Sequence, residues 1–194
     1  MSKYDVIIIG AGPSGIFCAY ELMRQKPDMK VLMIEKGRSI EKRQCPKRTT
    51  KVCVGCKPCS ITTGFAGAGA FSDGKLSLSP DVGGTLPEIL GYEKAEELIK
   101  EADNIYLKFG ADEKVYGIDD YEAIERIRAK AIRANLKLIE CPIRHLGTEE
   151  GYKIYTRLQE HLLASGVEIK FMTMVQDIII EDGVAKGVVT DKEE

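Results

Sequence analysis

The sequence predicts an α/β fold: a Rossmann-like, doubly wound parallel sheet with a βαβ unit, a β-meander hairpin and a small helical cap insertion. Three observations predict it. A short apolar run leads into the glycine-rich loop IIIGAGPSG at residues 7–15. A helical pattern and a second apolar run, KVLMIE, follow and end at Glu35. Near the C-terminus, VQDIIIEDGVAKGVV reads as two strands around Asp182-Gly183, which is typical of a hairpin.

The composition is that of an ordinary soluble globular protein. The 194 residues suffice for one domain with a core and a small appendage. With 44% hydrophobic residues, 30% charged residues and a net charge of −2, no global field draws the chain to nucleic acid or an anionic membrane. No apolar run is long enough to span a bilayer. We expect a cytoplasmic protein without a signal peptide, whose six cysteines stay reduced.

The first three elements follow from the spacing of apolar residues. Residues 4–9 read as a short strand buried on both faces, as expected of a central parallel strand. Residues 14–25 carry apolar side chains at helical spacing, and Pro27 breaks the pattern. Residues 30–35 read as a second strand. Strand, helix and strand in this order form a βαβ unit.

The middle of the chain is less regular. Residues 36–90 show no clear period, and so long an irregular stretch in a compact domain is usually functional or disordered. Asp119, with Glu122 three residues later, predicts the capping box of a helix. The other expected elements are a helix at 95–109, a strand at 136–146 broken by Pro142, a helix at 152–162, a buried strand at 167–172, and hairpin strands at 175–181 and 184–190.

The elements suggest two domains. Residues 1–84 and 147–194 are predicted to form a dinucleotide-binding domain, and residues 85–146 a small cap or substrate-side insertion. The nucleotide assignment depends on the roles of the glycines in the first loop. Gly10 permits the tight turn out of the strand, Gly12 lets a pyrophosphate approach the backbone, and Gly15 lets the helix pack close to the strand.

The residues around these glycines favour an adenosine diphosphate moiety. Pro13 suits the start of a helix, where its missing N–H costs little. The helix start itself offers a phosphate free N–H groups and a positive dipole end. Glu35 can accept hydrogen bonds from both ribose hydroxyls and would repel a 2′-phosphate. FAD and NAD both carry such a moiety, so these residues alone leave the choice open.

The sequence resembles a known family. Residues 4–38 are similar to the N-terminal motif of the two-dinucleotide-binding flavoproteins, the broad glutathione-reductase-like class, and residues 158–190 to its third parallel strand and the start of its β-meander. Residues 64–84, GFAGAGAFSDGKLSLSPDVGG, resemble a subgroup described as uncharacterised FAD-dependent dehydrogenases. The resemblance implies an FAD-binding βαβ unit in an FAD-dependent oxidoreductase. The implied FAD contacts are Gly10, Gly12, Pro13, Ser14 and Gly15 at the pyrophosphate, Glu35 at the ribose, Lys36 and Arg38 near the adenosine or phosphates, Val175 at the adenine, and Gly67, Ala68, Gly69, Ser72, Asp73 and Lys75 near the isoalloxazine.

The glycine-rich stretch at 64–75 also has a physical interpretation of its own. Its glycines bring backbone close to whatever they cover, and a flavin ring needs donors at the edge where charge builds up on reduction. Lys75 can stabilise that charge. The alternative is a flexible surface loop with a solvated lysine.

Four of the cysteines follow the spacing C-x7-C-x2-C-x2-C, at Cys45, Cys53, Cys56 and Cys59. Such thiolates can hold zinc or an iron–sulfur cluster, can act as redox thiols facing the flavin, or can have no special role. The spacing fits neither a standard zinc ribbon nor a standard ferredoxin run. Surrounding basic residues, Arg43 among them, can lower thiol pKa values or offset the charge of a thiolate centre.

Together these observations predict an oxidoreductase that moves hydride or electrons between NAD(P)H or another carrier and a small-molecule substrate. No catalytic acid or base is identified, no nucleic-acid or membrane partner is expected, and the oligomeric state is open. The alternatives are a nucleotide- or metal-binding module without chemistry and an NAD-dependent dehydrogenase. The flavoprotein class has a later strand that ends in a glycine-containing turn and a C-terminal segment that closes over the flavin. Neither is recognisable before Glu194, so we expect this sequence to be the N-terminal portion of such a protein.

Overall fold

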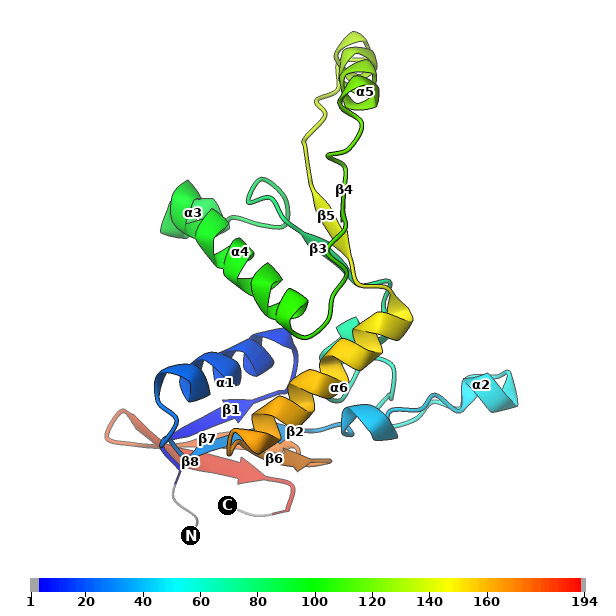
Figure 1. Ribbon diagram of the computed structural model, residues 1–194. Coiled ribbons are helices and arrows are strands. Elements are labelled where there is room, and N and C mark those ends of the chain that lie inside the picture. Colours follow the sequence, from blue (N-terminus) through cyan, green and yellow to red (C-terminus); the bar gives the residue numbers. More distant parts are fainter. Residues whose placement is uncertain (1–3, 193–194) are drawn as a thin grey trace. The chain divides into compact units, whose positions relative to one another are not determined.

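The computed structural model describes residues 4–192 (Figure 1). It divides into two compact units: the first comprises the chain up to Ser72 together with the chain from Gly151, and the second runs from Asp73 to Glu150. The domain limits and the cap role proposed for residues 85–146 stay predictions, and residues 1–3 and 193–194 lie outside the described residues. Within residues 4–192, no helix has the length and apolar character needed to cross a bilayer.

A three-stranded parallel sheet organises the first unit, in the order β1-β2-β6. Its strands are β1 (Val6–Ile9), β2 (Val31–Glu35) and β6 (Glu168–Phe171). All five residues of β2 are buried, as its central place requires. In β1 only Ile8 is buried, and Ile9 is 52% exposed. The expectation of a first strand buried on both faces is therefore wrong, because β1 is an edge strand among the described residues.

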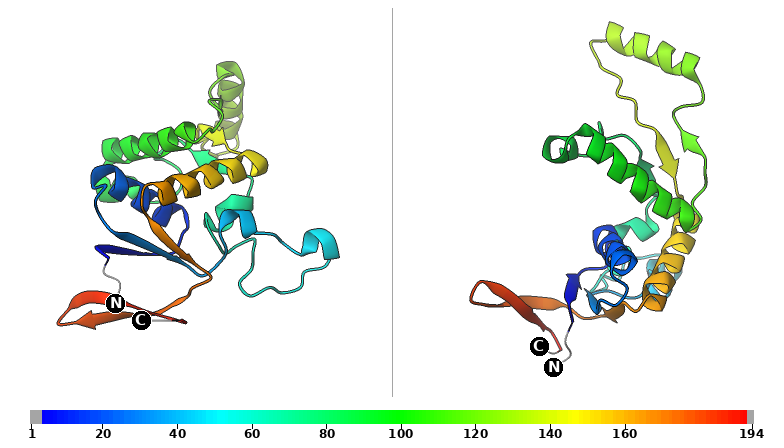
Figure 2. Two further views of the ribbon diagram at one scale, coloured as in Figure 1. Left: turned by 60° about the horizontal axis from the view of Figure 1, so that its bottom comes forward. Right: turned by 60° about the vertical axis from the view of Figure 1, so that its left-hand side comes forward.

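Helices cover one face of this sheet and a hairpin the other. Figures 1 and 2 show α1 (Pro13–Gln25) and α6 (Thr148–Ala164) on one side, and the hairpin of β7 (Val175–Glu181) and β8 (Val184–Thr190) on the opposite side. Both helices bury apolar residues at helical spacing. These include Ile16, Ala19 and Met23 of α1 and Ile154, Leu158 and Leu162 of α6. The predicted α/β class, with its parallel sheet and βαβ unit, is confirmed.

The irregular segment of the first unit contains only short elements. They are η1 (Ile40–Lys42), α2 (Lys47–Thr50) and η2 (Gly67–Phe71). The stretch around α2 extends away from the sheet (Figures 1 and 2). The chain then returns to the end of β2, where Arg38 and Gly64 form a parallel bridge. A Cβ on Gly37 would overlap the backbone of Gly64, so this close return requires glycine.

The second unit is built on a small antiparallel sheet in the order β3-β5-β4. Its elements are β3 (Lys75–Ser77), α3 (Leu86–Leu90), α4 (Tyr92–Lys108), β4 (Val115–Tyr116), α5 (Tyr121–Arg133) and β5 (Ile143–His145). The buried Arg144 joins sheet and helix, since it donates to both carboxylate oxygens of Asp103, at 2.5 and 2.7 Å, and to the Asp112 carbonyl at 2.6 Å.

Two expectations for this unit need correction. The N-cap of α5 is Asp120 and not Asp119, because the Asp120 carboxylate accepts a hydrogen bond from the Ala123 N–H at 2.8 Å. The strand expected at 136–146 is reduced to β5. The preceding residue, Pro142, has no N–H for a sheet ladder, and its carbonyl accepts a hydrogen bond from the Leu78 N–H at 2.8 Å.

Candidate functional site

The loop between β1 and α1 has the geometry of a phosphate cradle. Gly10 has a φ of +96°, and its N–H donates to the Ile34 carbonyl at 2.8 Å. A Cβ at Gly15 would overlap the Gly10 carbonyl oxygen and lie 3.2 Å from Ile8 Cγ2, so only glycine allows this packing of helix on strand. At Gly12, by contrast, a Cβ would meet no atom within 4 Å. The space above Gly12 is open.

The start of α1 is free to receive an anion. Gly12 is the N-cap residue, no side chain caps the helix, and its first turn holds no acidic residue. Pro13 and Ser14 are exposed. The first N–H groups of a helix have no intrahelical partner, and the helix dipole places a positive end there. This arrangement suits a phosphate group.

Glu35, the last residue of β2, lies against the same loop. Its side chain is buried, and its Oε2 accepts a hydrogen bond from the Ala11 N–H at 2.9 Å. Its Oε1 accepts one from the Gly37 N–H at 2.7 Å. A carboxylate has about four lone-pair positions, so both oxygens keep acceptor capacity for a hydroxyl. The structure thus brings the predicted ribose acid to the predicted phosphate loop.

The second glycine-rich stretch faces the first. The Ala66 N–H donates to the Ala11 carbonyl at 2.7 Å. Gly67 has a φ of +57°, and a Cβ there would lie 3.7 Å from the Cα of Gly12 and 3.9 Å from Pro13 Cδ. Ala66 itself has a φ of +69°, an uncommon conformation for a residue with a side chain. The Gly67 backbone therefore packs against Gly12 and forms the neighbouring wall of one cradle.

Arg43 is a residue of this site that the sequence analysis did not identify. It is 3% exposed and lies over the ring of Phe71, with its Cζ 4.8 Å from the ring centroid. It donates to four carbonyl oxygens, those of Ser60 at 3.0 Å, Ile61 at 2.7 Å, Phe65 at 2.5 Å and Gly67 at 2.7 Å. Burial lowers the pKa of its guanidinium from the ordinary value, while the Glu35 carboxylate acts in the opposite direction. In the sequence, nothing distinguishes Arg43 from its basic neighbours.

The other residues predicted near the isoalloxazine fall into two groups. Ala68 and Gly69 continue from Gly67 on η2, and the Ser72 hydroxyl donates to the Gly69 carbonyl at 3.2 Å. A Cβ on Gly69 would lie 3.5 Å from the Tyr155 hydroxyl oxygen. Asp73 and Lys75, in contrast, belong to the second unit.

In the second unit, Asp73 and Lys75 pair with each other and with His145. Lys75 Nζ lies 2.9 Å from Asp73 Oδ2, and His145 Nε2 lies 2.8 Å from Asp73 Oδ1. The hydrogen bond from His145, followed by that from Lys75, lowers the pKa of the Asp73 carboxyl from its ordinary value. The rings of Tyr116 and His145 pack in a T-shaped arrangement, with centroids 6.3 Å apart and planes at 80°. An exposed Asp–His pair of this kind can exchange protons with a bound molecule.

The residues predicted at the adenosine end stay predictions. Lys36 and Arg38 are exposed in the turn that follows Glu35. Val175 is half-buried, begins β7 and lies opposite Thr190. The nearby Thr173 N–H donates to the Glu35 carbonyl at 3.1 Å, which ties the start of the hairpin to the end of β2.

The predicted metal site is not supported. Among residues 4–192, no group of three or more Cys, His, Asp or Glu side chains is placed to hold a metal ion. Cys53 and Cys59 are exposed, whereas Cys45 and Cys56 are half-buried. The physical reason is that the stretch around α2 extends away from the sheet and leaves Cys53 and Cys59 exposed, so closeness in sequence does not gather all four thiols.

Cys59 is nevertheless expected to be a reactive thiol. Hydrogen bonds from the Thr62 and Ile61 N–H groups and the Thr62 hydroxyl, together with the charge of Arg43, lower its pKa from the ordinary value. A lower pKa means more thiolate at neutral pH, and the thiolate is the nucleophile. The rate of iodoacetamide alkylation at Cys59, followed by mass spectrometry against pH, should therefore reach its midpoint below that of free cysteine. Thr62→Val should move the midpoint upward, and an unchanged midpoint would contradict this assignment.

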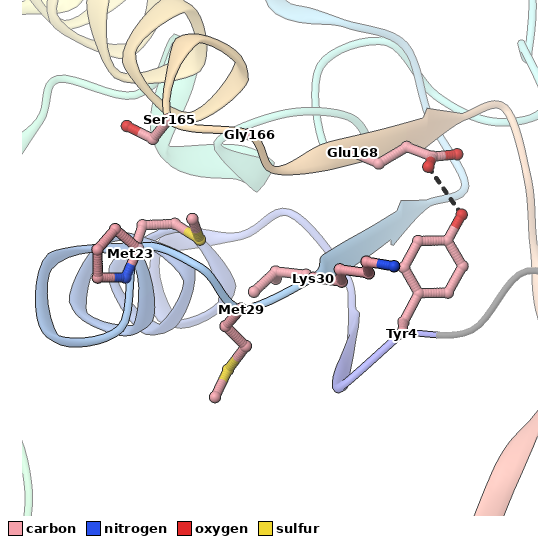
Figure 3. Close-up of a pocket in the computed structure, with 9 residues that line it drawn as sticks. Tyr4, Met23, Met29, Lys30, Ser165, Gly166 and Glu168 are labelled. Carbon is pink, nitrogen blue, oxygen red and sulfur yellow. Dashed lines mark hydrogen bonds between the residues drawn. The ribbon is translucent and has the colours of Figure 1, made fainter.

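A cavity of about 230 Å³ lies at the opposite end of the sheet, at the start of β2 and β6 (Figure 3). Tyr4 and Glu168 line it, and the Tyr4 hydroxyl donates to Glu168 Oε2 at 2.7 Å. Ligands of parallel α/β sheets bind outside the carboxyl ends of the strands. The glycine cradle lies at that end and this cavity does not, so the cradle is the candidate site.

The sequence comparisons match the N-terminal βαβ unit. The model of the Thi4 family matches residues 1–41, which include β1, α1 and β2. Over 33 residues, 17% of this chain, the sequence is 52% identical to the thiamine thiazole synthase of Coprinopsis cinerea, and the match covers 10% of that protein.

Solved structures resemble the chain over nearly its whole length. Glycine oxidase from Bacillus cereus superposes on 98% of the chain, with a TM-score of 0.53 and 18% identity. The 3-ketosteroid-Δ4-(5α)-dehydrogenase from Rhodococcus jostii superposes on 98%, with a TM-score of 0.56 and 18% identity. L-amino acid deaminase from Proteus vulgaris superposes on 100%, with a TM-score of 0.55 and 13% identity. At these identities the likeness concerns the fold. The matches cover 52%, 43% and 45% of those proteins, so the chain spans about half their length.

Proposed function

We propose that the chain is the FAD-binding part of an oxidoreductase, with the pyrophosphate in the open space at Gly12 and the start of α1, and the adenosine ribose at Glu35. The open space at Gly12 carries the proposal. A Cβ would fill that space, which is bounded by an uncapped helix start and a second glycine backbone. The Glu35 carboxylate lies on the β2 side of the loop, where a ribose needs an acceptor.

The residues present fit FAD in chemical terms. When bound, the flavin supplies the hydride or electron transfer. The protein holds the diphosphate with main-chain N–H groups, orients the ribose and fixes the second glycine stretch through Arg43. The names of the similar structures, an oxidase and a dehydrogenase among them, support an oxidoreductase. Among residues 4–192, no group of three or more Cys, His, Asp or Glu side chains is placed to hold zinc or an iron–sulfur cluster.

The similarity to thiamine thiazole synthase supports nucleotide binding and no particular substrate. The matching family model ends at residue 41, before the second glycine stretch and before the whole second unit. The substrate and the electron donor therefore stay undefined. A protein that binds a nucleotide without chemistry and an NAD-dependent dehydrogenase are the competing outcomes of the following test.

Glu35→Gln is expected to weaken FAD and ADP binding about tenfold or more, because it removes a charged acceptor for the ribose hydroxyls. Flavin fluorescence and calorimetry measure the two affinities, and ADP serves as the minimal probe. Glu168→Gln is the matched control, since this carboxylate lies at the other end of the sheet. Equal FAD binding by wild type and Glu35→Gln would contradict the proposed site. Binding of NAD in place of FAD would favour the NAD-dependent dehydrogenase.

A further inference from the structure

A second cavity opens at the carboxyl end of the sheet. Its volume is about 390 Å³. Arg38, three residues after the end of β2, and Met172, the residue after β6, line it. Residues of the stretch around α2, including Cys45 and Cys56, line it as well. We call this cavity the basic pocket. It lies at the edge of a parallel sheet where ligands bind, yet the cradle residues Gly10, Gly12, Glu35 and Gly67 do not line it.

All the charged side chains that line the basic pocket are cations. Arg38, Lys42 and Lys57 line it, and no carboxylate does. In the described part of the chain, none of these three side chains takes part in an ion pair. The cavity at the amino ends of the strands, in contrast, contains Glu168. A concave surface with one sign of charge concentrates counter-ions, here anions.

The sequence around the basic pocket strengthens this charge. Residues 36–72 contain eight lysines and arginines and a single acid, Glu41, in a chain whose net charge is −2. Glu41 is engaged elsewhere, since its carboxylate accepts hydrogen bonds from the Ser39 hydroxyl at 2.5 Å and from the Gln159 amide at 3.0 Å. Glu41 also interacts electrostatically with Lys42, so one carboxylate stands against eight cations in this segment.

The donors and the size of the basic pocket indicate the class of ligand. An arginine binds phosphate through paired N–H groups, and lysines bind it as point charges. The hydroxyls of Thr49 and Ser60 add neutral donors to the lining. The volume lies within the range of small-molecule sites, about 300–1,000 Å³, and exceeds what one phosphate fills. The volume has room for an organic part beside a phosphate.

We propose that the basic pocket binds a phosphorylated small molecule, with its phosphate held by Arg38, Lys42 and Lys57, at a site separate from the nucleotide cradle. The half-buried thiols of Cys45 and Cys56 form part of the wall, beside the bound molecule. The proposal uses none of Gly10, Gly12, Glu35 and Gly67. It shares Arg38 with the expected adenosine end of the FAD site, so its test must separate the two sites.

Cysteine alkylation tests this proposal within one molecule. Ribose 5-phosphate is the probe, and ribose is its uncharged counterpart. The probe at about ten times its Kd should slow iodoacetamide alkylation of Cys45 and Cys56 about tenfold, and ribose should not. Cys53 is exposed and does not line the pocket, so its rate should stay unchanged. Failure of both ribose 5-phosphate and inorganic pyrophosphate to protect Cys45 and Cys56 would overturn the proposal.

Variants separate this site from the cradle. Lys42→Gln combined with Lys57→Gln should abolish the protection, measured as the ratio of rates with and without probe. Lys47→Gln combined with Lys51→Gln, in the same segment but outside the pocket lining, should preserve it. Glu35→Gln should also preserve it. If Glu35→Gln removed the protection, or if FAD alone protected Cys45 and Cys56, the pocket would be an extension of the nucleotide cradle and the proposal of a separate site would be wrong.

Discussion

Gly15→Ala is expected to destabilise the first unit by about 3 kcal/mol and to abolish FAD binding. The new Cβ would overlap the Gly10 carbonyl oxygen, lie 3.3 Å from the Gly10 carbonyl carbon and 3.2 Å from Ile8 Cγ2. Two of these atoms are backbone, so no rotation of a side chain can relieve the contact. The start of α1 must move away from β1, and the cradle loses its shape. Chemical denaturation followed by circular dichroism measures the loss.

Gly12→Ala is the matched control for this prediction. No atom lies within 4 Å of a Cβ at that position, and the φ of −75° is accessible to alanine. Its stability should stay within about 1 kcal/mol of wild type. Its FAD affinity should nevertheless fall at least about tenfold, because the methyl group occupies the space proposed for the pyrophosphate. A Gly15→Ala variant as stable as wild type, or normal FAD binding by Gly12→Ala, would show that the cradle has been assigned wrongly.

The elements that could be predicted have local signals. The βαβ unit follows from two apolar runs and a glycine loop within the first 35 residues. The hairpin strands have the bounds expected from the sequence because Asp182 and Gly183, with φ of +50° and +75°, define a two-residue turn between them. Glu35 could be placed at the loop because the end of a parallel strand lies beside the loop that leaves its neighbour.

The features that could not be predicted depend on contacts between distant residues. Gly67 packs against Gly12, and His145 pairs with Asp73. The two residues of each pair are far apart in the sequence, so no local pattern predicts the contact. The exposure of Ile9 depends on which strands flank β1, and an apolar run carries no information about its neighbours. The four cysteines show the opposite case, in which residues close in sequence do not form a site. They belong to a stretch that extends away from the sheet (Figure 1), and they do not gather around a metal ion.

Arg43→Lys is expected to destabilise the first unit by about 3 kcal/mol and to reduce FAD affinity at least about tenfold. A guanidinium has five N–H donors in a planar fork, and Arg43 uses them on four carbonyls between Ser60 and Gly67. A lysine keeps the charge but presents three donors from one nitrogen, so it leaves carbonyls unpaired. The Gly67 wall of the cradle then loses its support, and limited proteolysis should cut between residues 60 and 67 before the rest of the chain.

The comparison with Arg48→Lys separates geometry from charge. Arg48 is an exposed arginine on α2, and the same substitution there should change stability by no more than about 0.5 kcal/mol. If Arg43→Lys were equally harmless, the positive charge alone would suffice and the hydrogen bonds to the carbonyls would be dispensable. If it lost stability but kept full FAD affinity, the Gly67 backbone would not be a wall of the nucleotide site. The FAD proposal would then depend on the first glycine loop and Glu35 alone. Arg43 fixes the shape of the second glycine stretch, and the Ala66 N–H joins that stretch to the Ala11 carbonyl of the first loop.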